Sequence, residues 1–341
     1  MLTHYLILQI NNTHKQFTTM SNISTIIKPL THDLALMENR LREPFQDQHE
    51  ILTLATEHLL SSGGKRLRPA IALLSSKIFN ANKDYAISLA AAVEMLHTAT
   101  LVHDDLIDGA LLRRGIKTLN ADLSSQATIL AGDYLFARAA NFASQTNSVR
   151  VMNLFSETLM TIVNGEIKQC FSDINISNRE NYFQRIEAKT ASMFALAAEA
   201  GAVLGTKDES IIDAMRKYGI NIGIAFQIVD DILDFTGTPQ NIGKPVGHDL
   251  QQGLITLPVI CYFEENPNDP DINSVLAENV DSSEIYDSII QSVCKSNAIK
   301  TSLSEASQYI EQAKLALSNV PLSNELSIIN DIADYVVQRQ I

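Results

Sequence analysis

The sequence has 341 residues, of which 26 are basic and 39 acidic, so the formal net charge is −13. This charge argues against a nucleic-acid-binding protein, which needs a basic surface. Hydrophobic residues make up 45% of the chain and charged residues 19%, which excludes a disordered chain and is ordinary for a globular protein. Only 14 glycines and 9 prolines are present, and so few turn-forming residues favour helices over many short strands.

Residues 1–19 are polar and largely without periodicity, and Met20 would make a natural start. We interpret 1–19 as a disordered or mis-annotated N-terminal extension. From about residue 30 onward, apolar residues recur at the three- and four-residue spacing of amphipathic helices. No linker or long repeat divides the rest of the chain, so residues 20–341 are expected to form one all-α domain of ten or more helices.

Three stretches are apolar on nearly every face, as is typical of helices at the centre of a bundle. They are residues 85–103, 191–205 and 219–233. Their neighbours are amphipathic, and the more polar last third, from about residue 265, is expected to pack around this centre.

The three cysteines, Cys170, Cys261 and Cys294, lie far apart and form no Cys-x-x-Cys pair. This spacing favours neither a disulfide framework nor a zinc site, and it is typical of a reducing compartment. No apolar run is expected to reach the roughly 18 residues of a membrane span, and the early YLILQI is too short for a signal peptide. We therefore expect a cytoplasmic protein with no transmembrane segment.

Two clusters of aspartates have the same spacing in two apolar stretches. The first cluster, in LVHDDLID, is Asp104, Asp105 and Asp108, and the second, in FQIVDDILDF, is Asp230, Asp231 and Asp234. On a helix, the first and third members of each cluster share a face and the second lies beside them. Like charges at this spacing repel, and the C-terminal end of a helix disfavours anions, so each cluster needs a cation.

Oxygen donors without histidine or cysteine favour a hard divalent ion, and Mg²⁺ typically combines one or two carboxylates with substrate phosphates. For a single motif of this kind, a solvated acidic face is the more common explanation. Here both clusters have apolar flanks, with Leu101 and Val102 before the first and Ile228 and Val229 before the second. Two such copies on buried helices favour metal binding by all six aspartates.

Basic residues near these clusters are candidates for binding diphosphate. GGKRLRP places Lys65, Arg66 and Arg68 beside two glycines and before Pro69, so cations and free backbone N–H groups gather where an anion can dock. Each of the basic residues, taken alone, is more often a surface cation. Further candidates for contacts with phosphate oxygens are Arg113, Arg114, Lys189, Thr190 and Lys244.

These motifs resemble, in order, those of the trans-isoprenyl diphosphate synthases, and most closely the bacterial octaprenyl diphosphate synthases. The likeness covers residues 50 to 260 through GGKRLRP, HTATLVHDDLID, RRG, GDYLFARA, EAKTASMF, FQIVDDILDF and GKPVGHDLQQG. It implies an all-helical bundle around a central cavity, usually a homodimer, in which the two aspartate motifs hold about three Mg²⁺ ions on an allylic diphosphate. The residues implied to bind isopentenyl diphosphate are Lys65, Arg68, His97 and Arg114. Those implied to bind the allylic diphosphate are Arg113, Lys189, Thr190, Gln227 and Lys244.

The implied reaction begins with loss of the allylic diphosphate, whose developing negative charge Mg²⁺, Arg and Lys stabilise. The resulting carbocation alkylates isopentenyl diphosphate, and the departing diphosphate takes the proton, so no side-chain base is needed. We expect the six aspartates, Arg113 and Lys189 to be the catalytic residues. Farnesyl diphosphate is the expected primer, and a quinone side chain is the expected use of the product.

Product length is expected to depend on residues below Asp104 on the same helix, namely Met95, Ala99 and Thr100. The small Ala99 predicts an open floor that admits a long product, with C40 preferred and C30 to C50 left open. A packing contact with a neighbouring helix is an equally common role for alanine in a bundle.

Two departures from the family pattern bear on activity. Gly109 and Ala110 replace the acidic or hydroxyl pair that commonly follows the first cluster, and Leu254 replaces a phosphate-binding lysine before TLP. The loss of that lysine motivates a rival hypothesis, a non-catalytic subunit that regulates an active partner. A squalene or phytoene synthase or a terpene cyclase is a further rival, against which GGKRLRP and RRG argue. Retention of both aspartate clusters and of GGKR favours the enzyme.

Overall fold

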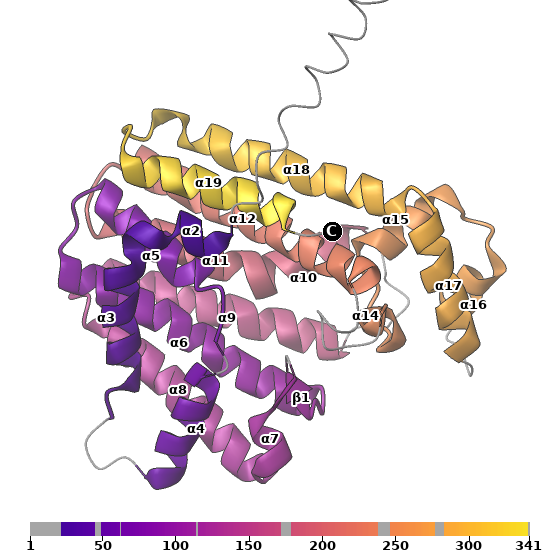
Figure 1. The fold of residues 1–341 in the computed structure, drawn as a ribbon, viewed down its shortest axis with the longest axis horizontal. Coiled ribbons are helices and arrows are strands. Elements are labelled where there is room, and N and C mark those ends of the chain that lie inside the picture. The colour runs from indigo at the N-terminus through magenta and orange to yellow at the C-terminus, as the bar shows by residue number, and fades with distance from the viewer. Residues whose placement is uncertain are drawn as a thin grey trace, which may run out of the picture.

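The computed structural model describes residues 22–44, 49–61, 63–113, 115–171, 179–237, 246–276 and 283–339 (Figure 1). Within these ranges the chain is helical apart from its connections and one antiparallel two-stranded hairpin. The predicted all-α bundle is therefore confirmed. The proposed extension, residues 1–19, lies outside the described residues, and the single domain over 20–341 stays a prediction.

Helices of very different length follow one another along the chain. The first half contains α2 (Ile23–Ile26), the 3-10 turn η1 (Lys28–Leu30), α3 (Thr31–Arg42), α4 (Glu50–Ser61), α5 (Leu67–Ile78), α6 (Lys83–Ile107), β1 (Leu112–Arg113), β2 (Ile116–Lys117), α7 (Leu119–Asp122), α8 (Ser125–Ser144) and α9 (Val149–Phe171). The second half contains α10 (Arg179–Ile186), the π turn η2 (Glu187–Ala191), α11 (Ser192–Val203), α12 (Glu209–Thr236), α14 (His248–Gln251), α15 (Leu257–Glu265), α16 (Pro270–Leu276), α17 (Ser283–Lys295), α18 (Ala298–Ala316), the 3-10 turn η3 (Leu317–Asn319) and α19 (Asn324–Gln338).

The two long helices that carry the aspartates begin at side-chain caps. The Asn82 carboxamide oxygen accepts hydrogen bonds from the backbone N–H groups of Asp84 and Tyr85 at the start of α6. The Asp208 carboxylate does the same for Ser210 and Ile211 at the start of α12. These caps satisfy N–H groups that have no partner within the helix. They fix where each helix begins and so where each aspartate cluster lies.

The centre of the bundle is formed by α5, α6, α11 and α12, with α8 and α9 against one side. In Figure 1, α18 and α19 lie across the opposite side, and α15 to α17 lie at one end. The stretches 85–103, 191–205 and 219–233 fall on α6, α11 and α12, which confirms that the most uniformly apolar sequence forms the central helices.

The central helix α6 is long and apolar enough to cross a membrane, with a mean hydropathy of 1.4 over an 18-residue window. The sequence prediction that no stretch reaches this length was wrong for α6. In the structure, 83% of that window is buried inside the protein, because α6 packs against α3, α5, α8 and α11. Its apolar surface is therefore used for packing within the bundle.

Candidate active site

The first aspartate cluster lies at the C-terminal end of α6, as predicted. Asp104 and Asp105 occupy the last turn, and Asp108 is the capping residue and is exposed. Buried Asp105 accepts a hydrogen bond from Arg113 Nε at 2.8 Å, and Asp104 lies 3.4 Å from Lys189 Nζ. Two full positive charges thus offset carboxylates at the unfavourable pole of the helix.

Asp231 is the most enclosed member of the second cluster, near the C-terminal end of α12. Its side chain is buried, and both of its oxygens accept hydrogen bonds from neutral donors. The Tyr182 hydroxyl donates to Oδ2 at 2.7 Å, and the Gln227 amide donates to Oδ1 at 2.8 Å. The position of this carboxylate is therefore determined from two directions.

The other two members of the second cluster have different partners. Asp234 accepts a hydrogen bond from the backbone N–H of Asp249 at 3.2 Å. Asp230 forms an ion pair with Arg339 Nη1 at 2.8 Å. Because Arg339 follows α19, this pair joins the C-terminal end of the described chain to the second cluster.

Two consecutive residues of the π turn η2 connect the clusters. Lys189 pairs with Asp104 on α6 and with Glu166 of α9 at 2.8 Å. The Thr190 hydroxyl donates to Gln227 Oε1 at 2.7 Å, and Gln227 in turn donates to Asp231. Single π turns within helices are frequent at functional sites. Here consecutive residues of the turn contact the first cluster directly and the second cluster through Gln227.

Close packing of α12 on the π turn η2 and on α11 depends on two glycines. A Cβ atom built on Gly219 would lie 2.5 Å from Ala195 Cα, and one on Gly223 would lie 2.4 Å from Ala191 Cα. Gly219, Gly223, Gln227 and Asp231 recur every fourth residue and so share one face of α12. The glycines let the helices approach, and the polar residues of the same face then meet η2 and α10.

Burial changes the acidity of one aspartate in each cluster. Removal from water raises the pKa of Asp104 to about 6, although the Lys189 charge opposes this rise. Burial raises the pKa of Asp231 to about 7, against the hydrogen bonds from Gln227 and Tyr182 that favour its charged form. Burial lowers the pKa of the Lys189 ammonium, but the charges of Asp104 and Glu166 outweigh it and the net shift is upward. A bound cation would favour the ionised form of both carboxyl groups.

The GGKRLRP residues divide into two groups in the structure. Arg66 forms ion pairs with Glu94 and Glu38, which marks it as a structural residue. Lys65 lies over the Tyr335 ring, 5.7 Å from its centre, and the Arg68 guanidinium lies 4.5 Å from the centre of the Phe194 ring. Half-buried His97 is on α6 below the first cluster. The remaining predicted ligands, Arg114 and Lys244, lie outside the described residues.

The proposed chain-length residues are packed in the core of α6. Met95 and Ala99 are each 0% exposed, so no space the size of a water molecule touches either side chain. The Thr100 hydroxyl donates to the His97 backbone carbonyl at 2.8 Å. Ala99 is therefore in contact with its neighbours on all sides, and its role in product length stays a prediction. A surface cavity of about 770 Å³ lies elsewhere, between α10 and α18.

The donor set at the two clusters fits an open Mg²⁺ site better than a closed one. Among the residues that the structure describes, no three His, Cys, Asp or Glu side chains converge into a complete metal cage. Mg²⁺ does not require one, because it typically takes one or two carboxylates and completes its shell with water and substrate phosphates. Ion pairs at three of the six aspartates show that positive charge is favoured at these positions.

Some functional neighbours of the clusters were missed from the sequence. Tyr182, Glu166 and Arg339 contact the predicted residues Asp231, Lys189 and Asp230. Arg339 is far from the recognisable motifs and gave no signal. Tyr182 lies in the short helix α10, directly before the EAKTASMF motif. This position next to a recognised motif was the only feature of the sequence that could have identified it.

Comparison with known proteins agrees with this geometry. The polyprenyl synthetase family profile matches residues 49–293. The chain belongs to the polyprenyl synthetase family, and it is a prenyltransferase. A prenyl transferase of Cyanophora paradoxa is 35% identical over 325 residues, which are 94% of this chain and 99% of the relative. Heptaprenyl diphosphate synthase component 2 of Bacillus subtilis is 35% identical over 312 residues, which are 91% of this chain and 89% of the relative.

Solved structures of this family have the same fold. A polyprenyl synthase from Caulobacter crescentus, complexed with calcium and isoprenyl diphosphate, superimposes with a TM-score of 0.87 at 32% identity and covers 95% of this prenyltransferase and 100% of that chain. A decaprenyl diphosphate synthase from Rhodobacter capsulatus gives a TM-score of 0.86 at 31% identity, and the match covers 93% of this prenyltransferase and 99% of that chain. The isoprenoid synthase fold is thus shown for this prenyltransferase.

Proposed function

We propose that this prenyltransferase elongates an allylic diphosphate with successive isopentenyl diphosphate units to a long all-trans polyprenyl diphosphate. The observation that carries the proposal is the polar network in which Lys189 and Thr190 connect Asp104 to Asp231. Two carboxylate clusters beside a partly buried lysine suit a substrate that carries several negative charges and divalent cations. The calcium and isoprenyl diphosphate bound to the Caulobacter relative support this substrate class.

In this mechanism the aspartates of both clusters would hold Mg²⁺. When bound, Mg²⁺ supplies positive charge that stabilises the departing diphosphate. Lys189 and Arg113, which pair with aspartates here, bind and orient the allylic diphosphate together with Thr190, Gln227 and Lys244. Lys65, Arg68, His97 and Arg114 bind isopentenyl diphosphate.

For product length we propose octaprenyl, C40, made from a farnesyl primer for a quinone side chain. The names of the relatives include heptaprenyl and decaprenyl products, which bracket this length. Because Ala99 and Met95 are closely packed, a growing tail has to displace side chains around them. A small residue at position 99 keeps that displacement easier than an aromatic residue would.

We further propose a cytoplasmic homodimer. Exposed apolar side chains on neighbouring helices support a second copy, namely Ile129 and Leu130 on α8 and Met160, Val163 and Ile167 on α9. The residues on α9 share one face at three- and four-residue spacing. Such a group of apolar side chains on adjoining helices is typical of a protein interface.

A second hypothesis is that this chain is one component of a heteromeric synthase, either catalytic or regulatory. It is favoured by the similarity to a protein named as component 2 of heptaprenyl diphosphate synthase. The absence of the family lysine at Leu254 also motivates it. The presence of both aspartate clusters argues that this chain is the catalytic member of any such pair.

One experiment separates these hypotheses. The purified chain is incubated with farnesyl diphosphate, isopentenyl diphosphate and Mg²⁺, and the product mass is measured, with EDTA as the control. Formation of octaprenyl diphosphate by the chain alone, abolished by EDTA, would support the proposal. No elongation alone, but elongation after a second subunit is added, would support the heteromeric hypothesis instead.

A further inference from the structure

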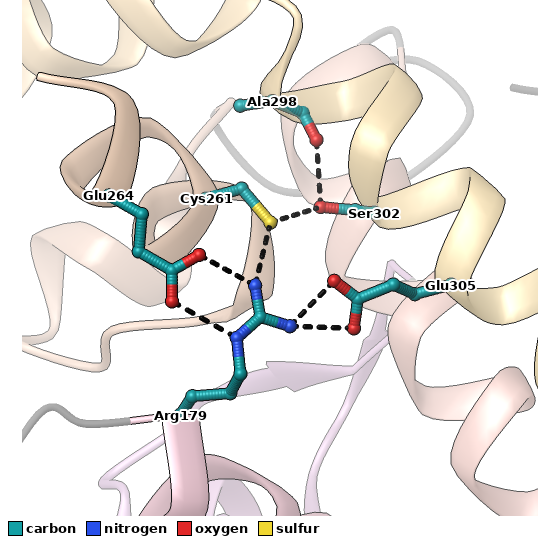
Figure 2. A network of polar contacts seen from close by, with 6 residues as sticks. All are labelled: Arg179, Cys261, Glu264, Ala298, Ser302 and Glu305. Carbon is teal, nitrogen blue, oxygen red and sulfur yellow. Dashed lines mark hydrogen bonds and ion pairs between the residues drawn. The ribbon is translucent and has the colours of Figure 1, made fainter.

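The first residue of α10, Arg179, is held by two carboxylates from different helices (Figure 2). Its Nη1 donates to both oxygens of Glu305 on α18, at 2.6 and 2.7 Å. Its Nε and Nη2 donate to the two oxygens of Glu264 on α15, at 3.0 and 2.7 Å. Paired hydrogen bonds between an arginine and a carboxylate fix orientation as well as distance. We call these three side chains the Arg179 clamp.

The sulfur of Cys261 adds a weaker contact inside the clamp. Arg179 Nη2 lies 3.7 Å from Cys261 Sγ, and the Ser302 hydroxyl lies 3.6 Å from the same sulfur (Figure 2). Ser302 also donates to the backbone carbonyl of Ala298 at 2.8 Å. The guanidinium is thus surrounded on the α15 and α18 sides, and the start of α10 is fixed relative to both helices.

The opposite end of α10 is fixed as well. Arg185 Nη2 donates to the backbone carbonyl of Ile255, just before α15, at 2.9 Å. The helix then continues into the π turn, where Lys189 and Thr190 reach the two aspartate clusters. Between these anchored ends, one turn after Arg179, lies Tyr182, whose side chain is 2% exposed.

Tyr182 and Gln227 divide the two oxygens of Asp231 between them. Each carboxylate oxygen has two lone pairs, so one hydrogen bond to each oxygen still leaves capacity for a metal ion. A carboxylate held in this way keeps its orientation before the ligand arrives. The contact of Tyr182 with Asp231 is made from a helix whose first residue is held by the Arg179 clamp, outside both aspartate clusters.

We propose that Tyr182 is a positioning residue that aims Asp231 at the divalent cation of the diphosphate complex, and that the Arg179 clamp holds Tyr182 in register. The inference rests on the proposed function, since it assigns a partner to a carboxylate that binds the metal. It goes further by giving α10 and the Arg179 clamp a role in ligand binding.

The direct test is Tyr182→Phe, which removes the hydroxyl and keeps the ring. Binding of Mg²⁺ with inorganic pyrophosphate is measured by isothermal titration calorimetry, without turnover, alongside the melting temperature. Loss of a hydrogen-bonding partner of a metal ligand typically weakens binding about 10- to 100-fold, and we expect a loss in this range with an unchanged melting temperature. Equal binding by the variant and the wild type would overturn the role of Tyr182.

The clamp is tested by Arg179→Met, with Arg179→Lys as the conservative variant. The matched control is Arg150→Met, because Arg150 forms a similar paired contact with Glu209, at 2.5 and 2.7 Å, at the far end of α12. We expect Arg179→Met to weaken Mg²⁺–pyrophosphate binding several-fold, Arg179→Lys to recover part of it, and Arg150→Met to bind as the wild type does. Equal effects of Arg179→Met and Arg150→Met would overturn the clamp's role.

Two further comparisons keep the result interpretable. If the wild-type protein itself bound no Mg²⁺–pyrophosphate, the proposed function would fail, and with it this inference. If the wild type and Asp231→Ala differed in binding but Tyr182→Phe did not, only the positioning role would fail. Should Tyr182→Phe not fold, the Arg179 variants still test whether the position of α10 matters, with Arg150→Met as their control.

Discussion

The two aspartate clusters have the same spacing and the same place at a helix C-terminal end, yet their surroundings differ. The first is neutralised by full charges, from Lys189 on Asp104 and Arg113 on Asp105. In the second, Asp230 also pairs with a full charge, that of Arg339, but the central Asp231 accepts hydrogen bonds from neutral donors. The same motif can therefore be stabilised either by cations that a diphosphate can recruit or by donors that remain in place.

This difference suggests a division of labour. The cations of the first cluster can exchange a carboxylate for a phosphate oxygen, because a salt bridge of a partly exposed lysine or arginine is weak. The donors at Asp231 cannot make that exchange, so they serve to hold the carboxylate still. Under the proposed function, we expect the first cluster to recruit the allylic diphosphate and the second to coordinate the cation from a fixed position.

The largest expected effect is loss of turnover when either cluster loses a carboxylate. Asp104→Ala and Asp231→Ala should each reduce kcat by at least about 10²- to 10³-fold, because charge stabilisation of the leaving group is lost. Steady-state elongation of farnesyl diphosphate measures this. The control is Asp213→Ala, which removes an exposed aspartate paired with Lys217 on α12 and should be active. Near-normal activity of both cluster variants would contradict the metal assignment.

Separating the clusters should have the next largest effect. In Gly223→Ala, the new methyl group would lie 2.4 Å from the Ala191 backbone, so α12 has to move away from the π turn. Overpacking of this kind costs about 1–3 kcal/mol, and the contact between Thr190 and Gln227 should weaken. Denaturant unfolding and elongation assays measure both effects, with Lys217→Ala on the exposed face of α12 as the control. A variant as stable and active as the wild type would show that the close approach is dispensable.

Of these substitutions, only one below the first cluster is expected to change the length of the product. Ala99→Phe places a ring where the side chain is already 0% exposed, so a growing tail has less room to displace its neighbours. We expect shorter products, measured by mass spectrometry, and a stability cost of about 1–3 kcal/mol. Ala99→Ser, which hardly changes the volume, should keep the wild-type product. An unchanged length distribution in Ala99→Phe would refute the role of this position.

The smallest expected effect is a dependence of stability on pH that distinguishes the clusters. Burial raises the pKa of Asp104 to about 6 and that of Asp231 to about 7, from 3.8. In the unfolded chain these carboxyl groups lose their protons near pH 3.8, whereas in the folded protein Asp104 does so near pH 6 and Asp231 near pH 7. Because the folded state binds more protons in this interval, its stability falls as the pH rises from about 4 to each folded pKa. Asp104→Asn and Asp231→Asn remove this loss.

Melting temperatures measured in EDTA between pH 4 and 8 test this expectation. Relative to the wild type, each variant should gain stability, and therefore melting temperature, with rising pH. The gain should level off near pH 6 for Asp104→Asn and near pH 7 for Asp231→Asn. Gains that level off at the same pH would contradict the difference in surroundings.

Much of the site could be predicted because its residues lie on regular helices. The i, i+1, i+4 spacing predicted a helix that carries the first cluster, where Asp104 and Asp105 occupy the last turn and Asp108 caps it, and the apolar flanks indicated that this helix is central. Lys189 and Thr190 were identified from the EAKTASMF motif. The link between these two residues and both aspartate clusters could not be predicted, because it depends on a π turn and on how closely α12 packs.

Two contacts and one buried residue show why the rest of the site could not be predicted from the sequence pattern. Tyr182 reaches Asp231 because α10 packs against α12, and Arg339 reaches Asp230 because α19 lies against α12. Ala99 could be interpreted equally well as an open floor or as a packing residue, and its burial, which the sequence pattern does not fix, depends on the helices packed against α6. Each outcome depends on side chains far away in the sequence.

The sequence by itself determined the helices, the apolar faces that bury them, and the carboxylates and cations that suit a diphosphate, because periodicity and residue chemistry are local properties. The tertiary structure decided which charge neutralises which aspartate and which neutral donor holds Asp231. Those partners come from separate helices, and their distances are set by packing, by two glycines that allow close approach, and by one arginine that anchors α10.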